Sequence, residues 1–302
     1  TDVRIPLMLQ YEPINKQTIY NIYCALSGVE KQIVKLGYSL IHPSVTTKVK
    51  VTDEMDELYS AIIDAPSPLG GRSGITHGQM TVHTMKTFFC ICPMAKHFLD
   101  TVKSSKAIVF LDYKECIGVA VKELQDYGII VITGDNTTSE REELRQMFQQ
   151  PNLDYRVLVT MNQISSIGTE YDDKHGGFPR AGFGIQNYIV SNSVQCPGRI
   201  GRENTQTNSL FFYVKYENED DENLEESVDR NIKEKSRVLR EALMNNGIIP
   251  PDSFIDIRYH SDINFNTLLK NAGNDKYVTV VKKPSKVSAP VIRKTSMVKE
   301  FI

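Results

Sequence analysis

The chain has 302 residues, of which 40% are hydrophobic and 24% charged, and it contains no tryptophan. This composition is ordinary for a globular protein and excludes a disordered tail, a collagen-like repeat and a small disulfide scaffold. The 35 basic and 37 acidic residues leave a formal net charge of −2, so no global field favours nucleic acid or a membrane surface.

The cysteines predict an intracellular protein, cytoplasmic or nuclear. Their number is odd, which favours reduced thiols over a disulfide framework. Two of them form a CxC pair, but no second pair stands at ligand spacing, so we expect no metal site. No apolar run approaches the ~20 residues that span a bilayer, and we expect no membrane partner. The five cysteines are Cys24, Cys90, Cys92, Cys116 and Cys196.

Residues 1–104 predict a mostly helical N-terminal segment. Apolar residues at three- and four-residue spacings form an amphipathic stripe from Ile14 to Leu36. Further helices are expected over 53–63 and 80–102. We expect a kink in the latter at Pro93, because proline removes a helical hydrogen bond.

The pattern changes in residues 105–216, where short apolar runs alternate with helical segments. Strands buried on both faces, joined by crossover helices, produce this alternation. The sequence therefore predicts an α/β fold with a parallel sheet flanked by helices. The expected strands cover 107–111, 129–133, 156–160, 184–190 and 210–215, and the expected helices cover 114–127, 139–149 and 196–202.

The rest of the chain predicts a helical extension over 217–273 and a basic tail over 274–302. A helix over 224–245 would end at Asn246-Gly247, a typical C-cap. The tail has seven basic and two acidic residues with little periodicity. Two interpretations remain open for it, a loose terminus or a segment that lies along a polyanion.

The stretch Gln195-Cys-Pro-Gly-Arg199-Ile-Gly-Arg202 is the richest in chemistry. Its two arginines, three residues apart, would share one face of a helical turn. A guanidinium keeps its charge and offers a planar fork of donors, which suits a phosphoryl group that gains charge in a transition state. By itself the pattern could equally be a surface cluster.

The order of segments gives this stretch a context. KAIVFLDY resembles motif IV of superfamily 2 helicases, RVLVTMNQISSIG resembles their motif V, and QCPGRIGR resembles their motif VI. The match covers 105–216 and implies the second RecA-like domain of such a helicase. Asp173-Lys-His-Gly-Gly-Phe-Pro-Arg180 is similar to the motif V extension of SNF2-like and strawberry-notch-like helicases, which are common in large viruses and phages.

The resemblance implies that ATP, or another NTP, binds with Mg²⁺ at the seam between two lobes. Arg202 would be the arginine finger that reaches the γ-phosphate. Arg199 would lie beside it, and Gln195 would help to place the attacking water. Both arginines would be aimed at the triphosphate of the adjacent lobe.

Four other residues receive roles from the same resemblance. Gly168 and Asp173 would lie near the nucleotide. Thr160 and Arg141 would contact phosphates of DNA or RNA, which position a strand without reading its sequence. For Arg141, a surface ion pair with a neighbouring glutamate is an equally good explanation.

The groups that hold a triphosphate are missing from the sequence. No G-x-x-x-x-G-K-[ST] occurs, so an N-terminal RecA-like lobe must supply the phosphate loop and the Mg²⁺ ligands. The run Asp53-Glu54-Met55-Asp56 only superficially resembles a DExD box, and its acids fit the first turn of a helix better.

These observations lead to two hypotheses. In the first, the chain is the C-terminal half of an NTP-dependent helicase or translocase and an NTP hydrolase only together with its other lobe, so that this chain alone is inactive. In the second, it is a non-catalytic scaffold or nucleic-acid-binding subunit of a larger assembly, a viral one included. A flavodoxin-like enzyme is disfavoured, because no glycine-rich loop follows the first strand.

Overall fold

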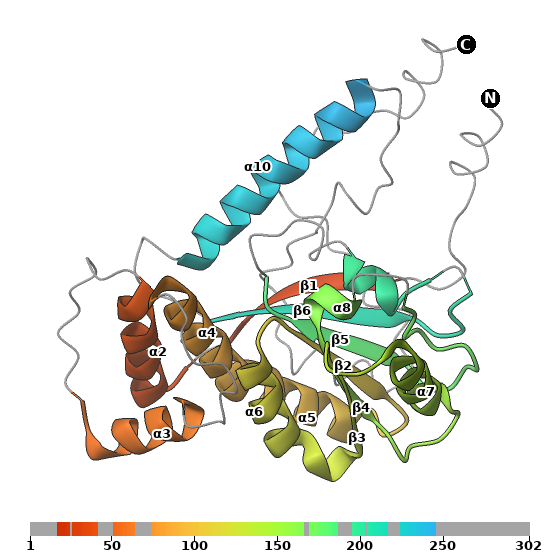
Figure 1. Ribbon diagram of the computed structural model, residues 1–302, viewed down its shortest axis with the longest axis horizontal. Coiled ribbons are helices and arrows are strands. Elements are labelled where there is room, and N and C mark those ends of the chain that lie inside the picture. The colour runs from red at the N-terminus through yellow and green to blue at the C-terminus, as the bar shows by residue number, and fades with distance from the viewer. Residues whose placement is uncertain are drawn as a thin grey trace.

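The computed structural model describes residues 17–24, 26–41, 51–63, 74–165, 169–186, 195–202, 204–216 and 224–245. Six strands form one sheet in the order β1-β6-β5-β2-β4-β3, and every neighbouring pair is parallel (Figure 1). Helices flank this sheet. The predicted α/β class, a parallel sheet flanked by helices, is confirmed.

Most strands lie where the sequence places them. Strand β2 (Lys106–Leu111) is buried along its whole length, as expected for a strand covered on both faces. The other predicted strands are also found to within two residues: β3 (Ile129–Ile132), β4 (Val157–Met161) and β6 (Ser209–Tyr216).

Strand β5 lies earlier than predicted, at Arg180–Gly184 instead of 184–190. Its Arg-Ala-Gly-Phe-Gly sequence does not look like a strand, because glycine has low β propensity. The tertiary packing requires the glycine, since a Cβ on Gly182 would stand 2.4 Å from Cδ2 of Phe211 on the neighbouring strand. Residues 187–190 lie outside the described part.

The N-terminal segment contains a strand that was not predicted. Residues Gln17–Cys24 form β1, which pairs over all eight residues with β6, so the helix expected from Ile14 to Leu36 is wrong in its first half. The backbone groups at the edge of β6 provide partners for β1 that the local sequence pattern does not reveal. Helix α2 (Gly28–Ile41) follows, and it begins with a capping box between Ser27 and Glu30.

Helix 53–63 agrees with the prediction, whereas the long helix expected over 80–102 begins six residues earlier, at Gly74. Helix α3 is Asp53–Ile63, and the long expected helix consists of α4 (Gly74–Lys86), a π-helical turn η1 (Thr87–Ile91) and α5 (Cys92–Thr101). Pro93 lies in the first turn of α5, directly after the π-helical turn. The expected irregularity is therefore found next to this proline.

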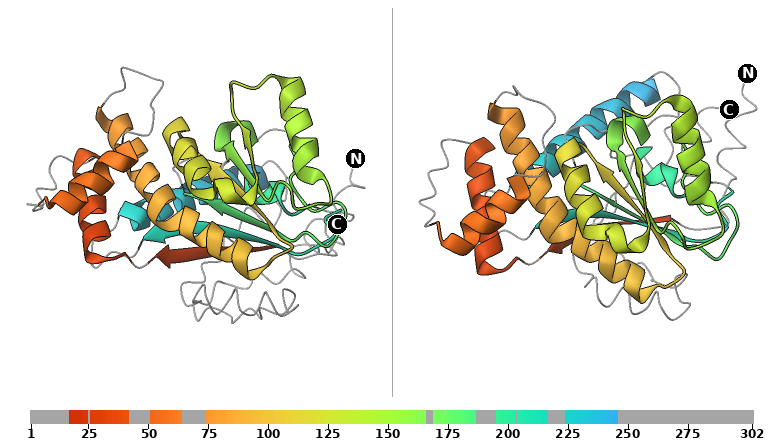
Figure 2. Two further views of the ribbon diagram at one scale, coloured as in Figure 1. Left: turned by 90° about the horizontal axis from the view of Figure 1, so that it is seen from below. Right: turned by 60° about the horizontal axis from the view of Figure 1, so that its bottom comes forward.

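The crossover segments and the last helix have the following bounds: α6 (Lys114–Leu124), η2 (Gln125–Tyr127), α7 (Thr138–Gln149), α8 (Asn162–Ser165), η3 (Pro197–Arg199) and α10 (Leu224–Asn245). Helices α2 and α3 lie at one end of the molecule and α7 at the other (Figures 1 and 2). The predicted basic tail, 274–302, lies outside the described residues.

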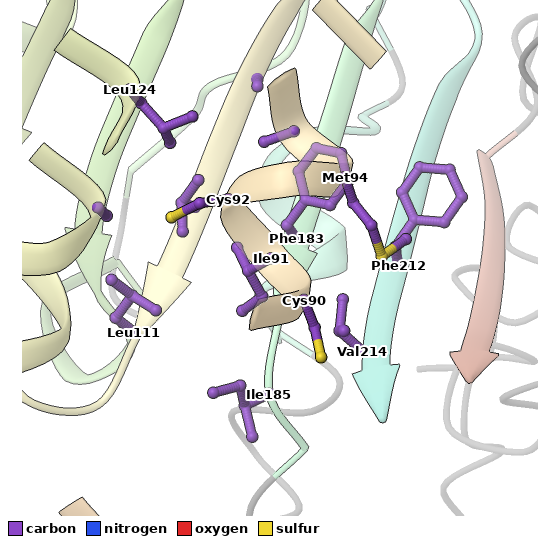
Figure 3. Packing of buried hydrophobic residues seen from close by; sticks show 14 of the residues in the cluster. Cys90, Ile91, Cys92, Met94, Leu111, Leu124, Phe183, Ile185, Phe212 and Val214 are labelled. Carbon is purple, nitrogen blue, oxygen red and sulfur yellow. The ribbon is translucent and has the colours of Figure 1, made fainter. Parts of the chain in front are cut away.

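Two hydrophobic clusters cover the two faces of the sheet. The larger one joins the η1–α5 segment and α6 to the strands, and Figure 3 shows Ile91 and Met94 of that segment above Phe183 and Phe212 of the sheet. The smaller one holds Phe148 of α7 together with residues around η3. The larger cluster continues across the boundary predicted at residue 104. Within the described ranges, no helix combines the length and the apolar character needed to cross a bilayer.

Candidate functional site

The segment from Gln195 to Arg202 crosses the face of the sheet that carries the smaller cluster. Gln195 is exposed, whereas Cys196 and Ile200 are buried in that cluster. The backbone N–H of Tyr171 donates to the carbonyl of Arg199 over 2.8 Å. The connection between β4 and β5 therefore lies directly against the arginine-bearing turn, so that the predicted motif V and motif VI regions are in contact.

Arg199 is directed into its own lobe. Its side chain is buried, and Nη1 donates to the carbonyl of Thr169 over 3.2 Å. Burial, together with the nearby charge of Arg202, lowers the pKa of this guanidinium. The expectation that both arginines point at an adjacent lobe is therefore corrected for Arg199, because its fork already holds a carbonyl of its own lobe.

Arg202 has different surroundings. Arg202 as a whole is only half-buried, although its Nε atom is buried and has no hydrogen-bond partner. Its guanidinium forms no ion pair with a carboxylate of the described residues. Because Arg202 is more exposed than Arg199 and is not neutralised by a described carboxylate, its charge is the one in this turn best placed to attract an external oxyanion.

A short polar network anchors the backbone of Arg202. The N–H of Arg202 donates to Oγ1 of Thr205 over 2.7 Å, and this hydroxyl donates to Oδ2 of Asp172 over 3.0 Å. Lys174 lies 3.4 Å from the other Asp172 oxygen and 2.7 Å from Oε2 of Glu170. The Lys174 hydrogen bond and the Arg202 charge both lower the pKa of Glu170. Sequence analysis identified none of these four supporting residues.

Asp173 has a structural role. Its carboxylate is fully buried and accepts hydrogen bonds from the backbone N–H groups of His175, Gly176 and Phe178, and from the Thr207 hydroxyl. It thereby fixes the loop that enters β5 and ties it to the start of β6. The carboxylate is enclosed by its own loop and by the residues that lead into β6, so it is not exposed for contact with a nucleotide.

Thr160 is also satisfied internally. Its Oγ1 lies 2.6 Å from Oγ of Ser165, which is in turn 3.3 Å from the Tyr171 hydroxyl. The threonine is fully buried, so it presents no hydroxyl to a strand phosphate in this conformation. Gly168, the other residue expected on this connection, lies outside the described residues.

Arg141 lies apart from the other predicted residues, on α7. Its Nη2 donates to the carbonyl of Gly134 over 3.1 Å, and its Nε is buried without a partner. The alternative of an ion pair with a neighbouring glutamate is not found, since Glu142 pairs with Arg145 instead. The guanidinium therefore binds the loop before α7 through one donor, and no described carboxylate neutralises its charge.

A second polar network, which sequence analysis missed, lies at the carboxyl ends of β2 and β4. Asn162 donates from Nδ2 to Oδ1 of Asp112 over 2.7 Å and accepts from Sγ of Cys196 over 3.3 Å. Nδ1 of His83 lies 3.4 Å from Oδ2 of Asp112. The available signal was position: Asp112 and Asn162 directly follow adjacent strands, whose ends meet at one edge of the sheet.

Burial controls the ionisation of this network. It lowers the pKa of His83 to about 4, against the opposing attraction of Asp112 and with help from the Lys86 charge. It raises the pKa of the Cys196 thiol to about 12, with a further contribution from Asp112. At neutral pH the imidazole is therefore neutral and the thiol protonated. We assign the network to holding the arginine-bearing turn at its Cys196 end.

No cluster of metal-ligating side chains is found among the described residues of the site. Among the residues that the structure describes, no group of three or more His, Cys, Asp or Glu side chains could hold a metal. The half-buried Arg202 guanidinium has the positive charge and the planar donors that suit a phosphate group.

Comparisons with known proteins leave the family open. No protein-family model matches the chain, and no curated protein matches it. Solved structures are similar to it, among them the crystal structure of the C-terminal part of the Fun30 ATPase domain, at 11% identity and a TM-score of 0.47, over 88% of this chain and 98% of that one. At this identity and TM-score, the similarity establishes neither family membership nor an activity.

Proposed function

We propose that the chain is the second lobe of an NTP-dependent nucleic-acid helicase or translocase, in which Arg202 contacts the γ-phosphate of an NTP held by the first lobe. The motif order along 105–216 supports this function. The observation that carries it is the half-buried Arg202 guanidinium, which no described carboxylate neutralises, beside an Arg199 that is buried and bound to Thr169. An arginine of this kind stabilises the charge that develops on a transferring phosphoryl group.

The other residues would divide the work as follows. The first lobe supplies the phosphate loop and Mg²⁺, which bind the triphosphate and neutralise its charge. Gln195, exposed at the start of the turn, would orient a water molecule. Arg199 holds the turn through Thr169 and adds positive potential from inside the lobe. Arg141, with its unpartnered Nε, is the better of the two proposed contacts to a DNA or RNA phosphate.

The decisive variant is Arg202→Ala, in a protein that contains both this chain and the phosphate-loop lobe. We expect kcat for ATP hydrolysis to fall by about 10³-fold, because an arginine finger contributes roughly that much or more. Nucleic-acid affinity should stay unchanged, since in this proposal Arg202 binds the nucleotide and not the strand. Steady-state hydrolysis and fluorescence anisotropy with a labelled oligonucleotide measure the two quantities. The 302 residues alone should show almost no hydrolysis.

Arg237→Ala is the matched control, because it removes an arginine from the exposed face of α10, where Glu234 and Glu241 bind it. It should leave both quantities unchanged. Equal hydrolysis by the Arg202→Ala and parent proteins, or strong hydrolysis by this chain alone, would contradict the proposal.

One set of observations favours the second candidate, a non-catalytic helicase-like scaffold. Arg199, Asp173 and Thr160 all form hydrogen bonds with groups inside the lobe. In a scaffold these three residues would serve only to stabilise the lobe. The Arg202→Ala experiment separates the two candidates, because a scaffold would keep its assembly contacts and would show no hydrolysis to lose.

A further inference from the structure

The loop 169–174 forms hydrogen bonds with the chain on both sides of Arg202. On one side, residues 169–174 bind the turn: Thr169 accepts from the Arg199 side chain, and Tyr171 donates to the Arg199 carbonyl. On the other side, the Asp173 carbonyl accepts from the N–H of Gln206 over 2.7 Å. The backbone on either side of Arg202 is thus attached to the same loop.

Hydrogen bonds connect this loop's acids to Arg202: the N–H of Arg202 donates to Thr205, and the Thr205 hydroxyl donates to Asp172. The positive charge of Arg202 also helps to lower the pKa of Glu170. A carboxylate near a guanidinium normally forms a two-pronged ion pair with it. Glu170 instead pairs with Lys174 over 2.7 Å, and the second acid, Asp172, is shared between Thr205 and Lys174.

We propose that Lys174 is a positioning residue, which holds Glu170 away from the Arg202 guanidinium and so keeps this guanidinium available to a phosphate. The inference rests on the proposed function, in which Arg202 meets the γ-phosphate. Lys174 is well placed to do this, because its ammonium lies between Glu170 and Asp172 and pairs with both carboxylates. Without it, Glu170 would compete with the phosphate for the same fork of donors.

The expected size of the effect follows from the exposure of the groups. The side chains of Lys174 and Glu170 are 31% and 42% exposed, so the ion pair that Glu170 would form with Arg202 is partly solvated. Pairs of this kind change an equilibrium by about two- to fivefold. The effect is small enough that the fold survives and large enough to measure.

The direct test is the rate at which phenylglyoxal modifies Arg202 in the 302-residue chain, followed by mass spectrometry of the peptide that contains it. Lys174→Met should slow this modification by about two- to fivefold, because an ion-paired guanidinium reacts more slowly. Adding Glu170→Gln to Lys174→Met should restore the parent rate, and Lys174→Arg should keep it. A merely structural role for Lys174 would not be rescued by changing Glu170.

Lys96→Met is the control, since it breaks the Lys96–Glu123 pair of comparable length far from the turn, and it should not alter the rate. An unchanged rate in Lys174→Met, or a slow rate that persists in the double variant, would overturn the assignment.

Hydrolysis by the two-lobed protein then tests the proposed function separately. Lys174→Met should lower kcat by the same two- to fivefold with little change in KM, and the double variant should recover it. If the phenylglyoxal rates behave as expected while kcat does not change, Lys174 still controls Arg202, but Arg202 does not serve hydrolysis and the proposed function is wrong.

Discussion

Arg199 and Arg202 are the same residue type, three positions apart, yet their surroundings differ. The Nε atom of each is buried without a hydrogen-bond partner, but the Arg199 side chain is buried and donates from Nη1 to a carbonyl of its own lobe, whereas Arg202 is only half-buried. The residue type predicted a phosphate-binding group at both positions. The loop around Thr169 decides between them, because its carbonyl reaches only one of the two guanidinium groups.

His83 provides a prediction about acid stability. Burial lowers its pKa to about 4 in the folded protein, compared with 6.5 for a histidine in water. Between these values the unfolded chain binds the proton and the folded chain does not, so the free energy of unfolding falls as the pH drops from about 6.5 to 4. The loss should reach the order of 3 kcal/mol, measured by urea denaturation across this range.

The difference in the free energy of unfolding between the parent and His83→Gln isolates this contribution, because all other titrating groups are common to both proteins. The difference should depend on pH only between about 4 and 6.5. A pH-independent difference for His83→Gln would mean that the imidazole is charged, or solvated, in the folded state.

At the scale of elements, the boundaries depend on single residues with special geometry. Gly128 separates η2 from β3 and has a φ of +69°, a conformation that favours glycine. A Cβ at this position would lie 1.9 Å from the carbonyl oxygen of Asp154 on the loop before β4. The close contact between the Gly128 and Asp154 segments determines where β3 begins beside β4.

Gly128→Ala should therefore destabilise the protein by about 2 kcal/mol or more, through backbone strain and the clash with Asp154. Gly118→Ala is the matched change, because Gly118 lies inside α6 with no atom within 4 Å of the added Cβ. It should stabilise by about 0.5–1 kcal/mol, since alanine has the better helix propensity. Chemical denaturation measures both, and a similar effect of the two changes would contradict this account.

At the scale of the whole molecule, the sheet joins parts of the chain that the sequence suggests are separate. Strand β1 comes from the N-terminal segment and extends the sheet beside β6, and the larger cluster includes residues from Ile22 to Val214. Helix α10 takes little part: among its described side chains, only Val228 and Ile232 are buried. The described fold is thus one sheet with two covered faces, to which α10 is a less buried addition.

Hydrogen exchange should reflect this distribution. Amides in the central strands β2, β4 and β5 should exchange at least ~100-fold more slowly than those of α10, because opening the centre of the sheet exposes both clusters. Exchange followed by mass spectrometry resolves these segments, and α6, packed on the larger cluster, serves as a helical reference. Protection of α10 equal to that of β2 would show that the helix is an integral part of the fold.

The sequence by itself was sufficient for the α/β class, for β2, β3, β4 and β6, and for the residue types of the arginine-bearing turn. These features depend on local periodicity and on side-chain chemistry, which neighbouring residues express directly. Only the tertiary structure decided that Gln17–Cys24 is a strand, that β5 begins at Arg180, and that Glu170 is held by Lys174 beside Arg202. Each of these depends on a partner far away in the chain or on the path of a folded loop, and local pattern contains no information about which backbone edge, ring or charge will be there.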